Sequence, residues 1–99
     1  MGYEYKIIAK FTEKQVAEIR ALLLNSKTFE KQYEFENNLF LDFRRPGNSG
    51  KIPNISIIFE SDGIYICQYG SSYLWTDLDQ LKDYLERENI EYKIIDYSD

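Results

Sequence analysis

Two short runs of alternating apolar residues on either side of Asp62-Gly63 constrain the fold more than any other feature of the sequence. Ile55 to Ser61 and Ile64 to Tyr69 repeat apolar side chains at every second position, which is the periodicity of a β-strand. Asp-Gly between two such runs is a strong signal for a tight hairpin turn. The sequence therefore predicts an antiparallel hairpin, with Ser61 opposite Ile64 if the turn has two residues.

The remaining segments alternate between further strands and two amphipathic helices. Strands are predicted over 3–11, 29–36, 39–43 and 91–97, and helices over 12–26 and 76–89. Thr12 and Gln15 have the spacing of a capping box, Thr76 is the expected cap of the second helix, and Asn37-Asn38 is the expected turn between two strands. The order β-α-β-β-β-β-α-β predicts an α+β fold. We expect one domain over 1–99, a two-layer sandwich in which a mostly antiparallel sheet of about six strands carries two helices on one face.

One face of the predicted sheet remains open when both helices cover the other. In the hairpin this open face carries Ser56, Ile58, Glu60, Tyr65, Cys67 and Tyr69. Other strands are expected to add Ile8, Phe40, Asp42 and Ile95. Contiguous exposed apolar surface often marks an interface. The competing interpretation is a set of scattered apolar residues covered by a loop, such as the segment 44–54.

The charge of the chain is unevenly distributed. The formal net charge is −5, and residues 52–99 contribute −7 of it while residues 1–51 contribute +2. A negative field repels nucleic acid and attracts basic partners. On the second helix Asp79, Asp83 and Glu86 follow a spacing of four and three residues, which places them on one ridge. This acidic ridge is either a solvated helix face or a docking site for a basic protein, and Asp77 and Asp79 also favour the helix N-terminus.

Two aromatic residues precede the acidic ridge. Tyr73 and Trp75 either fill the core beneath the helix start or flank the ridge as exposed anchors, since such residues dominate binding hot spots. In the second case Leu74 takes the buried position.

The composition argues against most catalytic and ligand-binding chemistries. Histidine is absent and Cys67 is the one cysteine, so no Ser–His–Asp triad, Cys–His pair or His-ligated metal is available. GNSGK over 47–51 is too short for a phosphate-binding loop and is followed by Ile52, and no calcium-binding loop motif occurs. We expect no enzyme, no metal and no cofactor. The N-terminus resembles no signal peptide and no run reaches the roughly 20 apolar residues of a membrane span, so we expect a cytoplasmic protein without membrane or nucleic-acid partners.

The stretches DGIYICQYG and LWTDLDQLKDYLEREN, together with the small size and acidity of the chain, resemble the small immunity proteins of bacterial toxin systems, including contact-dependent inhibition. This resemblance implies tight one-to-one inhibition of a toxin domain, often a basic nuclease. The acidic residues implied to steer association are Asp77, Asp79, Asp83 and Glu86. The aromatic residues implied to supply buried area are Tyr65, Tyr69, Tyr73 and Trp75. The alternative is a homodimeric structural or regulatory domain that associates through its open sheet face.

Overall fold

The predicted order of strands and helices is confirmed by the structure, a computed structural model that describes residues 2–97. The strands are β1 (Tyr3–Ala9), β2 (Phe29–Phe35), β3 (Asn38–Phe43), β4 (Ile55–Glu60), β5 (Gly63–Gln68) and β6 (Tyr92–Asp96). The helices are α1 (Glu13–Leu24) and α2 (Asp79–Arg87). The ends of the predicted domain, residues 1, 98 and 99, lie outside the described residues.

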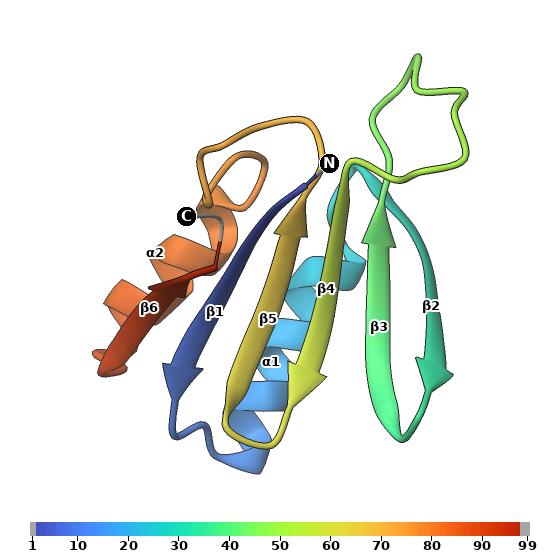
Figure 1. Cartoon of the computed structure of the whole chain (residues 1–99). Coiled ribbons are helices and arrows are strands. Elements are labelled where there is room, and N and C mark those ends of the chain that lie inside the picture. Colours follow the sequence, from blue (N-terminus) through green and yellow to red (C-terminus); the bar gives the residue numbers. More distant parts are fainter. Residues whose placement is uncertain (1, 98–99) are drawn as a thin grey trace.

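The strands form one antiparallel sheet, and both helices cover the same face of it (Figure 1). The sheet order is β2-β3-β4-β5-β1-β6, so β1 lies between β5 and β6 while β2 is an edge. The two layers enclose a core to which the sheet contributes Ile7, Leu41, Phe43, Ile55, Ile57, Ile64 and Ile66, and the helices contribute Ile19, Leu23, Leu81 and Leu85. Complete burial of each such apolar side chain is worth roughly 1.5–3 kcal/mol.

Helix α1 begins with the predicted capping box. The Thr12 hydroxyl accepts a hydrogen bond from the Gln15 amide at 3.0 Å, and the Gln15 side-chain oxygen accepts one from the Thr12 amide at 3.0 Å. Two of the four backbone donors that a helix start leaves unpaired are thereby satisfied. The predicted apolar stripe faces the sheet through Ile19 and Leu23, which are buried.

Helix α2 begins later than predicted, and Thr76 is not its cap. The Thr76 hydroxyl lies 2.7 Å from the Ser71 hydroxyl, and its carbonyl accepts a hydrogen bond from the buried Gln68 side chain at 3.0 Å. Asp77 then adopts a left-handed φ of 60°, which a helix cannot continue through. Leu78 therefore occupies the N-cap position without a side-chain cap, and Asp77 lies before the helix instead of in its first turn.

The β4–β5 hairpin has a different register from the predicted one but the same faces. Glu60 pairs with Gly63 and Ile58 with Tyr65, so Ser61 and Asp62 form the turn. The register differs by two positions, and side chains alternate with a period of two, so the predicted inner and open faces stay as they were. Gly63 belongs to the strand because β1 passes close to it, and a Cβ atom there would collide with the Ile7 carbonyl oxygen.

Strand β2 is not the half-buried strand that its alternation predicts. Its turn consists of Glu36 and Asn37, both with positive φ, and not of Asn37 and Asn38 as predicted, so Phe35 pairs with Asn38 and Tyr33 with Phe40. A β-bulge between Phe29 and Lys31 then adds one residue, Glu30, to the strand. An extra residue reverses the face of what lies beyond it. Phe29 therefore faces the core with Phe43, while Lys31, Tyr33 and Phe35 face the open side.

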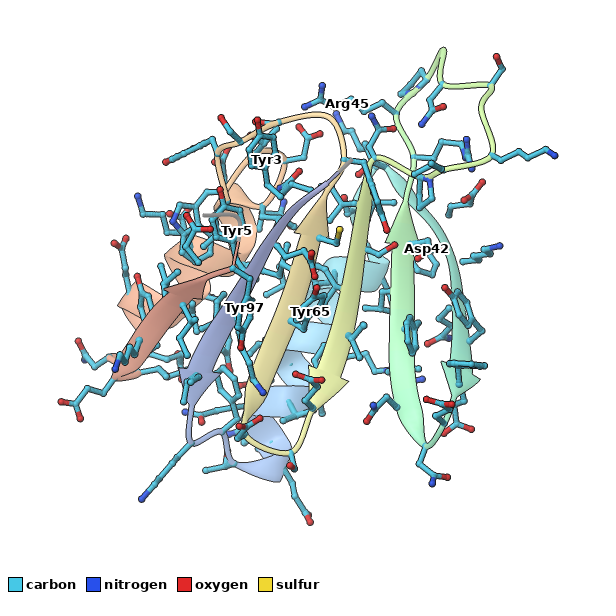
Figure 2. The ribbon with its side chains drawn as sticks, viewed as in Figure 1. Tyr3, Tyr5, Asp42, Arg45, Tyr65 and Tyr97 are labelled. Atoms are coloured by element: carbon cyan, nitrogen blue, oxygen red, sulfur yellow. The ribbon has the colours of Figure 1, made fainter. Side chains whose placement is uncertain are left out.

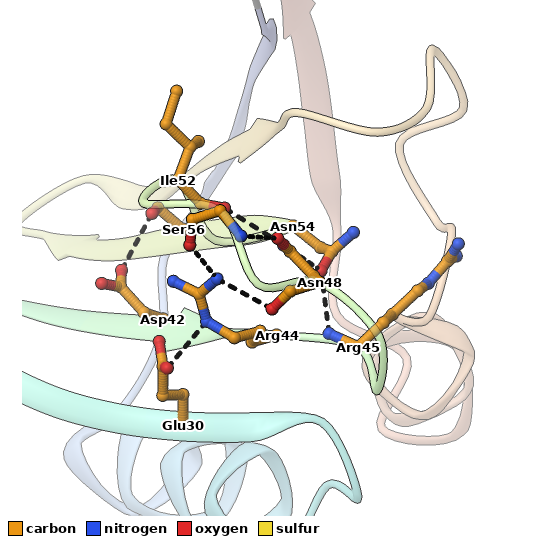
Figure 3. A network of polar contacts seen from close by, with 9 residues as sticks. Glu30, Asp42, Arg44, Arg45, Asn48, Ile52, Asn54 and Ser56 are labelled. Atoms are coloured by element: carbon orange, nitrogen blue, oxygen red, sulfur yellow. Dashed lines mark hydrogen bonds and ion pairs between the residues drawn. The ribbon is translucent and has the colours of Figure 1, made fainter.

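The segment 44–54 is the predicted loop, and it projects beyond the ends of β3 and β4 (Figure 1). The Arg44 side chain organises it, because its guanidinium donates to the carbonyls of Asn48 at 3.2 Å and Gly50 at 2.5 Å and pairs with Glu30 at 2.8 Å (Figure 3). The loop does not extend over the open face (Figure 1), which contradicts the interpretation that it covers this face.

Neither of the helices in the described part of the chain is long and apolar enough to cross a lipid bilayer.

Candidate protein-binding face

The open face of the sheet is the candidate site, and three of its aromatic side chains form a cluster at the β2–β3 end. Tyr33 stacks on Phe40 with ring centroids 5.1 Å apart, and Phe35 meets Phe40 edge-on at 6.1 Å. We call Tyr33, Phe35 and Phe40 the aromatic cluster. Phe35 remains 58% exposed and Tyr33 40% exposed. Aromatic rings of this kind are enriched at protein interfaces, so the cluster offers apolar area to a partner.

A shallow depression of about 390 Å³ lies beside the aromatic cluster, over the middle of the sheet. We call it the central hollow, and it is lined by Gly2, Glu4, Tyr33, Phe40, Ser56, Ile58, Tyr65, Cys67 and Tyr69. Four of these residues are aromatic, one is a carboxylate, and none of the residues that line it is a lysine or arginine. Figure 2 looks onto this face and shows Tyr65 over β5 and Asp42 on β3.

One carboxylate, Glu4, lines the hollow, and a second, Asp42, lies behind two of its lining residues, Ser56 and Tyr33. Glu4 accepts a hydrogen bond from the Tyr65 hydroxyl. Asp42 is only 4% exposed and accepts a hydrogen bond from the Ser56 hydroxyl at 2.8 Å. Burial raises the pKa of Tyr33, and the charge and hydrogen bond of Asp42 raise it further. Burial, followed by Cys67 and then Asp42, raises the pKa of Tyr69 to about 12. Both tyrosines therefore stay protonated near neutral pH.

Cys67 has the environment of a packed thiol. Burial raises its pKa, and it is 9% exposed. A Cβ atom on Gly2 would lie 2.8 Å from the Cys67 sulfur, so Gly2 packs closely against the thiol. Because the thiolate is the reactive form of cysteine, this environment opposes a nucleophilic role.

The lysine that neighbours Tyr65 on β1 is engaged by acidic partners. Lys6 pairs with Glu60 at 3.0 Å and with Asp62 at 2.6 Å. Hydrogen bonds from Lys6 first to Asp62 and then to Glu60 raise the pKa of its ammonium group, and Lys6 lowers the pKa of Asp62. The charge of Lys6 is therefore neutralised at the edge of the face and does not offset the carboxylates of the hollow.

The structure separates the site residues that the sequence grouped together. Tyr65 and Tyr69 lie on the open face, where they line the central hollow. Asp79, Asp83 and Glu86 are exposed on α2, and α2 buries Leu81 and Leu85 against the opposite face of the sheet. The acidic ridge and the open face are thus two surfaces on opposite layers of the molecule.

Asp77, Tyr73 and Trp75 have separate positions. Asp77 pairs with Arg45 at 2.5 Å and ties the loop 44–54 to the start of α2. Arg45 and Arg44 are both engaged by carboxylates, so the positive charge of these two residues is largely neutralised. Tyr73 is 57% exposed in the segment before α2.

Trp75 is not an exposed anchor, and that interpretation is corrected by the structure. It is 6% exposed and packs edge-on against Tyr92 of β6 with ring centroids 6.3 Å apart. Leu74 beside it is also buried, at 6%. Both side chains are held inward because Gln68 donates hydrogen bonds to the carbonyls of Leu74 at 2.9 Å and Thr76 at 3.0 Å. Trp75 is therefore part of the core.

Sequence reasoning missed Tyr33, Phe35 and Glu4 as members of this face. The unbroken alternation of Phe29, Lys31, Tyr33 and Phe35 predicts a half-buried strand and carries no sign of the bulge. Only the two-residue turn before Asn38 carried a signal, since a turn of that length fixes which residues oppose Phe40. Glu4 reaches the hollow because β1 pairs with β5, placing Glu4 opposite Cys67.

No group of three or more cysteine, aspartate or glutamate side chains within residues 2–97 is placed to hold a metal ion. A comparison of the chain with models of protein families, with curated proteins and with solved structures finds no match.

Proposed function

We propose that this chain is a non-enzymatic protein-binding domain that covers a partner with the open face of its sheet. The observation that carries the proposal is the aromatic cluster, which presents Tyr33, Phe35 and Phe40 side by side on a face that no helix or loop of the described residues covers. An antiparallel sheet commonly has one solvated face, but the outer positions of such a face are usually polar. Exposed aromatic rings beside a hollow are typical of binding surfaces.

The partner that fits best is a basic protein, and the role that fits best is that of an immunity protein occluding a toxin domain. The net charge of −5 and the carboxylates of the hollow favour a partner of positive charge. The acidic ridge lies on the other layer, so it acts on such a partner through its long-range field and not by contact. A homodimer through the same face is the second candidate, and it would use the same aromatic cluster.

The decisive experiment is affinity capture from extracts of the source cells with matched baits. Phe35→Lys places a charge in the aromatic cluster, and Ile52→Lys makes the same kind of change in the loop 44–54, where Ile52 is also 58% exposed. We expect the unaltered chain and Ile52→Lys to retain the same basic protein at low salt, and Phe35→Lys to lose it. Mass spectrometry identifies the retained protein, and its activity is then measured with and without the chain.

Equal retention by all three baits would contradict the open-face proposal. Recovery of only the chain's own copies, insensitive to salt and abolished by Phe35→Lys, would establish the homodimer instead.

A further inference from the structure

We propose that the central hollow is a recognition pocket for a single arginine side chain presented by a basic protein partner. The inference rests on the proposed function, because it assigns the partner chemistry that the open face would recognise.

The first support is the buried carboxylate of Asp42. It is 4% exposed, yet its hydrogen-bond partners are hydroxyl groups: Ser56 donates to it at 2.8 Å and Tyr33 is hydrogen-bonded to it. No ion pair within the described residues reaches this carboxylate. Buried carboxylates are ordinarily paired with a cation. Asp42 does not line the hollow, but both of its hydroxyl partners do, so a cation bound there would lie close to this negative charge.

The second support is the composition of the walls. Four aromatic rings, those of Tyr33, Phe40, Tyr65 and Tyr69, line the hollow, and aromatic faces attract cations. Within the same face Lys31 already places its ammonium group 5.6 Å from the centroid of the Tyr33 ring. The rim adds a second carboxylate, Glu4, beside the Tyr65 hydroxyl. A cation in the hollow would thus meet aromatic rings and the Glu4 carboxylate at its walls, with the Asp42 charge behind Ser56 and Tyr33.

Arginine fits this chemistry better than lysine. A guanidinium group is planar, stacks on aromatic rings and is less strongly hydrated than an ammonium group, so it loses less on leaving water. Its five donors also match separated acceptors such as carboxylate and hydroxyl oxygens. A second copy of this chain is a poorer occupant, because two molecules with a net charge of −5 each repel one another.

The test is a titration of the isotope-labelled full chain, followed by two-dimensional NMR. The probe is N-acetyl-arginine amide, and the matched control is N-acetyl-citrulline amide, which has the same shape without the charge. We expect saturable shifts at amides around the hollow, such as those of Ser56 and Cys67, and about a fivefold preference for the arginine compound.

Two isosteric variants separate the hollow from the acidic ridge. Asp42→Asn should weaken the arginine probe by at least about fivefold, whereas Asp83→Asn, which removes one charge on the opposite layer, should leave it unchanged. Glu4→Gln provides a second variant of the hollow at an exposed position, should Asp42→Asn fail to fold, and the NMR spectrum itself reports folding.

Equal shifts with arginine and citrulline, shifts centred on α2, or equal losses in Asp42→Asn and Asp83→Asn would overturn the inference. A chain that is dimeric through this face at the NMR concentration, as measured by light scattering, would overturn it in favour of a second copy. If the arginine probe fails, the capture experiment with Phe35→Lys still tests the open-face function independently. That variant leaves both carboxylates intact.

Discussion

Tyr84 is a single side chain that joins the two helices beneath the sheet. It is 4% exposed, and its hydroxyl donates a hydrogen bond to the Glu18 carboxylate of α1 at 2.6 Å. Burial, followed by that carboxylate, raises its pKa to about 12. The hydroxyl must remain protonated to donate, so the contact couples the packing of α1 on α2 to alkaline pH.

Removing this hydroxyl should destabilise the protein in a pH-dependent way. A charged acceptor makes the hydrogen bond worth about 1.5–3 kcal/mol, so Tyr84→Phe should lower the free energy of unfolding by that amount at pH 7. The folded-state pKa lies above the value of about 10 in an unfolded chain, so the stabilisation is complete below about pH 10 and disappears as pH rises towards 12. Denaturant titrations at pH 7, 10 and 12 should therefore show the two proteins converging.

Tyr73→Phe is the matched control, because Tyr73 is 57% exposed. A Tyr84→Phe protein as stable as the unaltered chain at pH 7 would show that the Glu18 contact adds nothing to stability.

At the scale of elements, the bulge in β2 links the shape of the binding face to the order of the neighbouring loop. Its extra residue, Glu30, pairs with Arg44 at 2.8 Å, and Arg44 in turn holds the loop carbonyls of Asn48 and Gly50. The irregularity that lets Phe29 turn inward thus also supplies the carboxylate that positions the base of the loop 44–54.

Loss of the Arg44 guanidinium should loosen this loop with little effect on the rest of the fold. In Arg44→Gln we expect cleavage after Lys51 by a lysine-specific protease to accelerate roughly fivefold, because about 1 kcal/mol of local order is lost. The free energy of unfolding should change by less than about 1 kcal/mol, since the pair is partly exposed. Mass spectrometry measures the cleavage, and Arg20→Gln, outside the loop, is the control. Equal cleavage in both variants would mean that Arg44 does not order the loop.

The elements themselves were predictable because their signals are local. Thr12 and Gln15 lie three residues apart, and the alternation over 55–69 assigned each side chain to the correct face although the register differed by two positions. Three features depended on distant residues and were missed. Gly63 lies in β5 because β1 passes close to it. Thr76 is hydrogen-bonded by Gln68 and Ser71 and does not cap the helix. The bulge at Glu30 turns Phe29 inward, whereas the register set by the turn six residues away would leave it on the open side.

At the scale of the whole molecule, the two-layer arrangement determines which of the predicted site residues belong to one surface. The sequence placed Tyr65 and Asp83 in one group because both belong to one stretch of chain, whereas the fold places them on opposite layers. Charges in solution are screened over a Debye length of about 8 Å at physiological salt, while the molecule measures 28 Å along its shortest axis. The acidic ridge therefore adds nothing to the contact on the open face, and its effect on the rate of encounter is confined to low salt.

The core should unfold as one cooperative unit, since it joins both helices, the sheet and the segment containing Trp75. Trp75 is the one tryptophan of the chain, so its fluorescence reports the segment before α2, while circular dichroism reports the backbone as a whole. In urea the two transitions should coincide, with a slope of roughly 1 kcal/mol per molar. A fluorescence transition at lower urea than the dichroism transition would show that this segment unfolds separately.

The bulge in β2 also determines which single-residue deletions in this strand would leave the open face intact. Loss of the codon for Glu30 would leave Lys31 opposite Asp42 and Tyr33 opposite Phe40, as they are now. Loss of the codon for Glu34, which removes the same amino acid, would bring Tyr33 opposite Leu39 and turn its ring towards the helices. For this strand, the position at which a reading frame loses three nucleotides matters more than the residue that those nucleotides encode.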